Sequence, residues 1–128
     1  MDGVIRHREP DPGGSRTVRF EGQSHGSGVS FFLVDNDPGQ GPPLHVHPYP
    51  ETWVVRSGEA EFTVGADKTR AGVGDIVVGP PGIPHKFLNV GTGRLEVICI
   101  HASDTFIQDN VEDRSGAPRP LAEASGRC

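Results

Sequence analysis

Hydrophobic positions in this chain fall into short segments, several of which alternate with polar residues at every second position. Alternation with a period of two is typical of a strand that buries one face. Glycine- and proline-rich turns separate the segments, so the pattern predicts many short strands rather than long helices. About eight strands are expected: one at His45, and seven at residues 17–20, 29–34, 52–56, 60–64, 75–78, 85–88 and 95–101. This spacing favours an all-β sandwich or barrel.

The pattern changes at both ends of the chain. Residues 1–16 are polar with several glycines and prolines, and we expect a flexible N-terminal arm. From residue 113 to 128 glycine, alanine, proline and serine dominate, which predicts a disordered tail. Between them, residues 17–112 are expected to form one domain. Its last part, residues 104–112, carries Phe106, Ile107 and Val111 in a spacing that suits one short helix or an extended strap.

Composition narrows the possible partners. The 128 residues include 12 basic and 17 acidic side chains, a net charge of −5, with no dense lysine or arginine cluster. This argues against a nucleic-acid or membrane partner. No apolar run approaches the length of about 18 residues that would span a bilayer, and the N-terminus lacks the apolar core of a secretory signal. We therefore expect a cytoplasmic protein, in which Cys99 and Cys128 do not form a disulfide framework.

Three histidines and one glutamate stand out as a candidate metal site. His45 and His47 are two residues apart, so in an extended segment both side chains face the same way. Glu51 follows a Pro48–Tyr49–Pro50 corner and can return to that face, and His85 supplies a third imidazole from about forty residues later. Three imidazoles and one carboxylate suit one divalent transition metal ion per chain, Fe, Mn, Ni, Co or Zn.

These residues lie within two motifs that resemble those of the cupin family. The first motif, G-x5-H-x-H-x3,4-E-x6-G, is matched at Gly39, His45, His47, Glu51 and Gly58. The second, G-x5-P-x-G-x2-H-x3-N, is matched at Gly74, Pro80, Gly82, His85 and Asn89. Both occur in the right order, and the short segment between them is similar to that of small single-domain bacterial cupins. The resemblance implies an all-β double-stranded β-helix, a jelly-roll-like barrel, with His45, His47, Glu51 and His85 as metal ligands.

Strand alternation extends the expected site. If Glu51 faces inward, so do Trp53 and Val55, and if His85 does, so do Phe87 and Asn89. In the last long strand one face carries four residues, and the pattern does not decide whether that face lines the cavity: Leu95, Val97, Cys99 and His101. The candidate catalytic residues are Glu51, His101 and Tyr49. His101 is either a second functional imidazole or an ordinary strand-end residue, and Tyr49 either gates the mouth or donates a hydrogen bond.

The function that the resemblance implies covers several classes, because one fold supports many reactions. Our leading hypothesis is a metal-dependent oxidoreductase of dioxygenase type acting on a small organic substrate. The alternatives are a non-redox lyase, isomerase or cyclase, and a non-catalytic small-molecule-binding or sensor protein.

The apolar runs at residues 31–34 and 98–100 leave one face of each strand that another part of the protein or a partner must cover. Because cupins commonly form dimers, these runs predict a homodimer with residues near 17–34 at the interface.

Overall fold

The computed structural model describes residues 16–112, so the expected tail, His7, Cys128 and all of the expected arm except Arg16 lie outside the described residues. Within this range the chain forms ten short strands and one short 3-10 helix, η1. The elements are β1 (Val18–Phe20), η1 (Gly22–His25), β2 (Ser30–Asn36), β3 (His45–Val46), β4 (Glu51–Ser57), β5 (Ala60–Val64), β6 (Asp67–Ala71), β7 (Ile76–Gly79), β8 (His85–Asn89), β9 (Leu95–His101) and β10 (Asp109–Asn110). The all-β expectation is confirmed.

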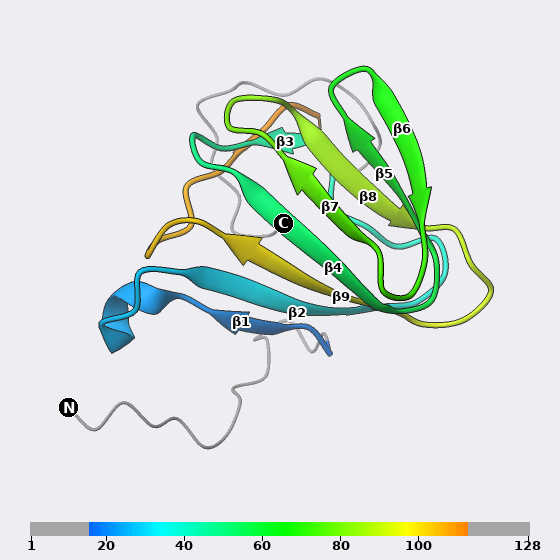
Figure 1. Cartoon of the computed structure of the whole chain (residues 1–128), viewed down its shortest axis with the longest axis horizontal. Helices are drawn as coiled ribbons and strands as arrows, with labels where there is room; N and C mark the ends of the chain where they lie inside the picture. The colour runs from blue at the N-terminus through cyan, green and yellow to red at the C-terminus, as the bar shows by residue number, and fades with distance from the viewer. Residues whose placement is uncertain (1–15, 113–128) are drawn as a thin grey trace.

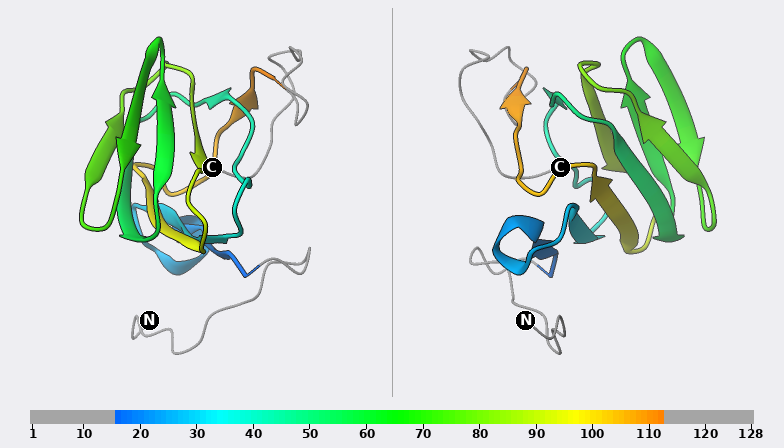
Figure 2. Two further views of the ribbon diagram at one scale, coloured as in Figure 1. Left: turned by 90° about the vertical axis from the view of Figure 1, so that its right-hand side faces the viewer. Right: turned by 60° about the vertical axis from the view of Figure 1, so that its left-hand side comes forward.

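The strands form two five-stranded antiparallel sheets (Figure 1). The first sheet has the order β1-β2-β9-β4-β7 and the second the order β10-β3-β8-β5-β6. Strands β10 and β6 therefore form opposite edges of the second sheet, as both views in Figure 2 show. Consecutive strands β3 and β4 belong to different sheets, so the Pro48–Tyr49–Pro50 corner carries the chain from one layer to the other.

The hydrophobic core lies between the sheets and follows the alternation of the strands. In β4, residues Glu51, Trp53 and Val55 are buried, while the residues between them are partly exposed. In β9 the buried face is the one that carries Leu95, Val97, Cys99 and His101, which settles the orientation that the sequence left open. The largest fully buried apolar side chains are Trp53, Phe32, Phe62, Phe87 and Leu95.

Strand β6 was not predicted, because four of its five residues are exposed and its sequence is mostly polar. It pairs only with β5, at the edge of the second sheet. An edge strand buries little side-chain surface, so the hydrophobic pattern that reveals other strands is missing. The pairing with β5 determines this element, and pairing is a long-range property.

Residues 102–112 form the extended strap rather than the short helix. Backbone hydrogen bonds tie the strap to the start of the domain, where Gln23 N–H donates to the Asp104 carbonyl. The carboxylate of Glu21 accepts the N–H of Phe106 at 2.9 Å. At its end, β10 pairs with β3, next to His45. Since these partners satisfy the backbone of the segment, helical hydrogen bonds are not needed.

No helix in the described part of the chain is long and apolar enough to cross a membrane.

Candidate metal centre

The strand register brings the site residues together from both sheets. Glu51, the first residue of β4, lies opposite His101 at the end of β9. In the other sheet, His45 of β3 lies opposite His85, the first residue of β8. His47 follows β3, and its ring centroid is 4.6 Å from that of His85 and 4.8 Å from that of His101. Four imidazoles and one carboxylate therefore meet between the sheets.

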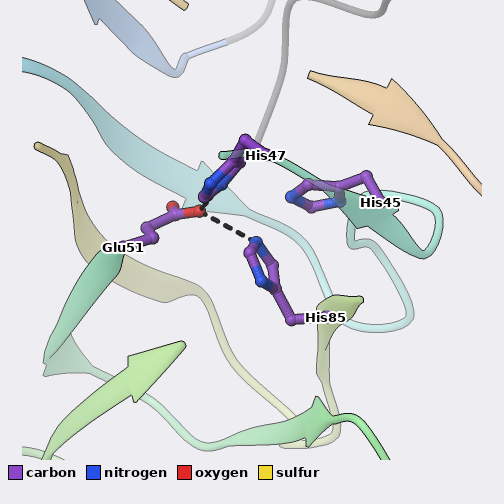
Figure 3. A group of neighbouring side chains, drawn as sticks. All are labelled: His45, His47, Glu51 and His85. Carbon is purple, nitrogen blue, oxygen red and sulfur yellow. Dashed lines mark hydrogen bonds and ion pairs between the residues drawn. The ribbon is translucent and has the colours of Figure 1, made fainter. Parts of the chain in front are cut away.

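His45, His47, Glu51 and His85 form one compact buried group, as the motif predicts. Each offers one ligand atom, and these atoms all lie within 4.8 Å of one another. Figure 3 shows the three imidazoles arranged around the Glu51 carboxylate. Glu51 Oε1 is 2.8 Å from His47 Nε2 and 3.1 Å from His85 Nε2. No member of the group is more than 3% exposed. The arrangement is compatible with a single transition metal ion.

Backbone carbonyls fix the proton on each of these three rings. The acceptors are the carbonyl oxygens of Pro43 for His45 Nδ1 (2.7 Å), Tyr49 for His47 Nδ1 (2.8 Å) and Ile83 for His85 Nδ1 (3.2 Å). A carbonyl oxygen only accepts, so Nδ1 is the donor in each case. The neutral ring then carries its lone pair on Nε2. All three rings are thus set in the tautomer that presents Nε2 as a metal ligand.

The donor set fits a divalent cation. Three Nε2 lone pairs and a carboxylate oxygen face one another. Hydrogen bonds within residues 16–112 do not satisfy all of these atoms, because His45 Nε2 is buried and has no hydrogen-bond partner there. Burial, followed by the nearby His85, lowers the pKa of His45 to about 3, so this ring is neutral at neutral pH. Burial by itself would raise the pKa of Glu51. The imidazoles of His101, His47 and His85 outweigh it and hold that pKa well below its usual value. A metal ion requires such deprotonated donors.

His101 and Tyr49 also lie at this centre. His101 is fully buried, with Nε2 3.2 Å from Glu51 Oε2. Its Nδ1 is 2.6 Å from the Tyr49 hydroxyl. Tyr49 is only 7% exposed, so its hydroxyl lies inside the protein, beside His101, rather than at an open mouth. Of the two roles expected for Tyr49, the geometry supports the hydrogen bond.

The apolar residues expected in the pocket belong to the core that adjoins the site. Trp53, Val55, Phe87 and Cys99 are all members of the buried hydrophobic cluster. The Trp53 ring meets the His85 ring edge-on, with centroids 4.8 Å apart. Trp53 therefore supports the orientation of His85.

Asn89 lies elsewhere than the pocket expectation placed it. It is buried, but its Nδ2 donates to the carbonyl oxygens of Asn36 and Gly93, and its Oδ1 accepts the N–H of Gly91. Four residues along β8 from His85 correspond to about 13 Å. Asn89 therefore holds the turn after β8 and the end of β2, a structural role at the far end of the strand.

Phe106 and Phe32 are site neighbours that the sequence did not reveal as such. The Phe106 ring stands edge-on to His101, with centroids 4.9 Å apart, and stacks on Phe32 at 4.6 Å. The Arg19 guanidinium lies over the Phe106 ring, 4.8 Å from its centroid. The apolar spacing in residues 104–112 indicated that Phe106 docks, but only the path of the strap shows where.

Comparison with known structures identifies the architecture. An uncharacterized conserved protein from Klebsiella pneumoniae with a double-stranded β-helix domain is 27% identical, with a TM-score of 0.64 over 79% of this chain and 87% of that one. Oxalate decarboxylase from Bacillus subtilis is 23% identical, with a TM-score of 0.66, and oxalate oxidase in complex with glycolate is 24% identical, with a TM-score of 0.67. These matches cover 74% and 79% of this chain, but only 27% and 57% of the two enzymes. They show the fold alone.

Among curated proteins, none matches the sequence significantly. The cupin domain family does match, over residues 32–101, which is more than half of the chain and includes both motifs. The two antiparallel sheets are those of a double-stranded β-helix, as the structural relatives also show. On this match, the fold and the clustered motif residues, the chain belongs to the cupin family.

Proposed function

We propose that this protein is a metal-dependent enzyme that binds one divalent transition ion through His45, His47, Glu51 and His85. The observation that carries this proposal is the convergence of three Nε2 lone pairs and Glu51 Oε1 within one buried group, where His45 Nε2 has no other partner among the described residues. Three nitrogen donors and one oxygen donor suit Fe, Mn, Ni, Co or Zn.

Held by these four side chains, the ion would supply Lewis acidity or, as iron, oxygen chemistry to a small organic substrate. The chain itself supplies the surroundings. The rings of Trp53, Phe32 and Phe106 pack against site histidines and exclude water. A dry, largely apolar setting protects a reactive substrate from hydrolysis. We therefore favour an oxidoreductase of dioxygenase type.

A non-redox lyase, isomerase or cyclase is the second candidate, and one feature favours it. His101 and Tyr49 form a buried hydrogen-bonded pair beside the second oxygen of Glu51. Such a pair offers exchangeable protons beside the metal ligands, which suits proton transfer without oxidation. The oxalate decarboxylase and oxalate oxidase relatives show that this fold carries both kinds of reaction.

Metal exchange separates the candidates. Protein freed of metal by chelation is reloaded separately with Fe(II), Mn(II) or Zn(II), and each form is mixed with small ligands that bind through two oxygens, such as catechols, diketones and enols. The dioxygenase proposal expects oxygen uptake with the Fe(II) form and at least one ligand. Glu51→Ala should abolish the uptake, whereas His25→Ala, a histidine outside the buried group, should retain it.

Two other outcomes select the alternatives. Conversion of a substrate by the Mn(II) or Zn(II) form without oxygen would establish a non-redox lyase, isomerase or cyclase. Tight binding of a ligand without turnover under any metal would identify a sensor or binding protein. Failure of every metal to bind after reconstitution would remove the proposal altogether.

We also propose that the active form is a homodimer, in which a second copy covers the outer face of the first sheet. One row across this face is Leu33, Ile98, Val54 and Ile76, and the next is Phe31, Ile100, Thr52 and Val78. Neither row contains a charged side chain, and Ile76 and Val78 are 65% and 54% exposed. An uncharged apolar face can pack against its own copy about a twofold axis without charge repulsion.

A further inference from the structure

His101 differs from the other three histidines of the centre in the partner of its Nδ1 atom. The others face carbonyl oxygens, which only accept, whereas His101 Nδ1 faces the Tyr49 hydroxyl at 2.6 Å. That hydroxyl oxygen accepts the backbone N–H of Ile107 at 3.2 Å. Its own hydrogen is then directed to His101, and a separation of 2.6 Å is typical of an O–H donor and short for an N–H donor.

The hydroxyl therefore fixes the opposite tautomer. With Nδ1 accepting, neutral His101 carries its proton on Nε2. This N–H lies 3.2 Å from Glu51 Oε2. The contact is not aligned as a full hydrogen bond, but neither atom has a hydrogen-bond partner elsewhere in residues 16–112.

We propose that His101 is the hydrogen-bond donor of the metal centre, not a fifth ligand, and that Tyr49 holds it in that state. The Nε2 proton of His101 engages Glu51 Oε2, so that only Oε1 faces the three Nε2 lone pairs and the carboxylate binds through one oxygen. His101 and Tyr49 are thus positioning residues. The inference rests on the proposed metal centre, but not on whether the reaction is oxidative.

Tyr49 sets two histidines in opposite tautomers. Its backbone carbonyl accepts from His47 Nδ1 at 2.8 Å, which leaves the His47 lone pair on Nε2. Its side-chain hydroxyl donates to His101, which leaves the proton on Nε2. The Tyr49 ring also stacks on the His47 ring, with centroids 4.4 Å apart. Tyr49, at the corner between β3 and β4, therefore sets His47 as a metal ligand and His101 as a hydrogen-bond donor.

Nuclear magnetic resonance of the side-chain nitrogens tests this directly. Long-range 1H–15N correlation spectra of full-length protein labelled at histidine distinguish the two neutral tautomers and a metal-bound nitrogen. Spectra are recorded before and after one equivalent of Zn(II). We expect His101 in the Nε2–H form in both states. We expect the rings of His45, His47 and His85 in the Nδ1–H form, with Zn(II) on Nε2.

Variants add a second readout, the affinity for Zn(II) measured by competition with a chelator. Loss of a residue that orients a ligand typically lowers affinity by about 10- to 100-fold. We expect a loss in this range for His101→Leu and Tyr49→Phe. His101→Gln, which keeps an amide N–H near the Nε2 position, should recover most of it. His25→Gln is the matched control and should bind as the wild type does.

Zn(II) bound to His101 Nε2, or an Nδ1–H tautomer of His101, would overturn the inference, and the wild-type spectra alone decide this even if a variant fails to fold. Equal Zn(II) affinity in His101→Leu and wild type would overturn it too. Loss of activity plays no part in either measurement. If Zn(II) does not bind at all, the metal centre fails, whereas the metal-free spectrum still reports the tautomer of His101.

Discussion

At the scale of single residues, the centre depends on which atoms hold protons. Three histidines donate Nδ1–H to backbone carbonyls and therefore carry no proton on Nε2. The backbone at Pro43, Tyr49 and Ile83 sets this arrangement. Glu51 remains ionised in spite of burial because imidazoles surround it. The geometry thus prepares a ligand set before any ion arrives, and the ordering cost of metal binding is correspondingly small.

Removal of a single imidazole should lower metal affinity strongly. We expect His47→Ala and His85→Ala each to weaken Zn(II) binding by at least about 100-fold, more than the typical effect of a residue that only orients a ligand. The reason is that each substitution removes one of four converging donors. Isothermal titration with the purified full-length chain measures this, with His25→Ala as the control expected to remain within about twofold. Unchanged affinity in His85→Ala would contradict the ligand assignment.

As pH is lowered, the stability of the metal-free protein should begin to fall at a higher pH than the protonation of its carboxylates would explain. The pKa of His45 is about 3 in the fold and near 6.5 in the unfolded chain, so below pH 6.5 unfolding takes up a proton. The contribution of His45 to stability is therefore complete above pH 6.5 and is lost as pH falls from there toward 3. Its slope approaches about 1.4 kcal/mol per pH unit.

Urea unfolding of chelator-treated protein between about pH 7.5 and about pH 5, values on either side of 6.5, measures this slope. His45→Gln removes the titrating ring, so its slope should be smaller than that of the wild type. Equal slopes in the two proteins would show that His45 does not carry the effect.

At the scale of elements, short strands and tight turns place the ligands. The turn between β4 and β5 requires Gly58, whose φ of +83° lies in the left-handed region. A Cβ there would also meet the Arg94 carbonyl oxygen at 2.5 Å. Gly58, the last residue of the first motif, is thus explained by its backbone conformation and by the close approach of the Arg94 carbonyl, and not by contact with the metal ligands.

Gly58→Ala should therefore destabilise the protein by about 2 kcal/mol or more, since the strain of positive φ and a backbone clash add. Gly93 is the matched control: no heavy atom lies within 4 Å of a Cβ at that position, and its φ is not positive. Gly93→Ala should be neutral or stabilise by up to about 1 kcal/mol. Urea denaturation curves of both variants give the comparison. Equal effects at the two glycines would refute the explanation.

At the scale of the whole molecule, the apolar outer face of the first sheet predicts association. Light scattering at micromolar concentration should give twice the chain mass of 13.7 kDa. Leu33→Glu or Ile76→Glu should shift the mass toward the monomer, because each places a charge in a face that would be buried against its copy. Val73→Glu makes the same change at a 70% exposed valine in the turn after β6, outside both rows, and should leave the dimer intact. A monomeric wild type would disprove the dimer.

The sequence by itself determined much of the centre. The spacing of His45 and His47, the corner before Glu51 and the second motif at His85 predicted four residues that do meet in one buried group. Alternation correctly placed Trp53 and Val55 on the side of Glu51, and Phe87 on the side of His85. These predictions succeed because they depend on local geometry: side chains alternate along a strand, and turns at fixed spacing return the chain to the same face.

Only the tertiary structure decided the rest. Alternation gave the residues that share a face with His101 but not which face is buried, because that depends on the pairing of β9 between β2 and β4. The polar edge strand β6 and the path of the strap likewise depend on partners far away in the chain. The tautomer of His101 depends on Tyr49, 52 residues away. Contacts between distant segments are set by how sheets pair and pack, and a local pattern carries no record of that choice.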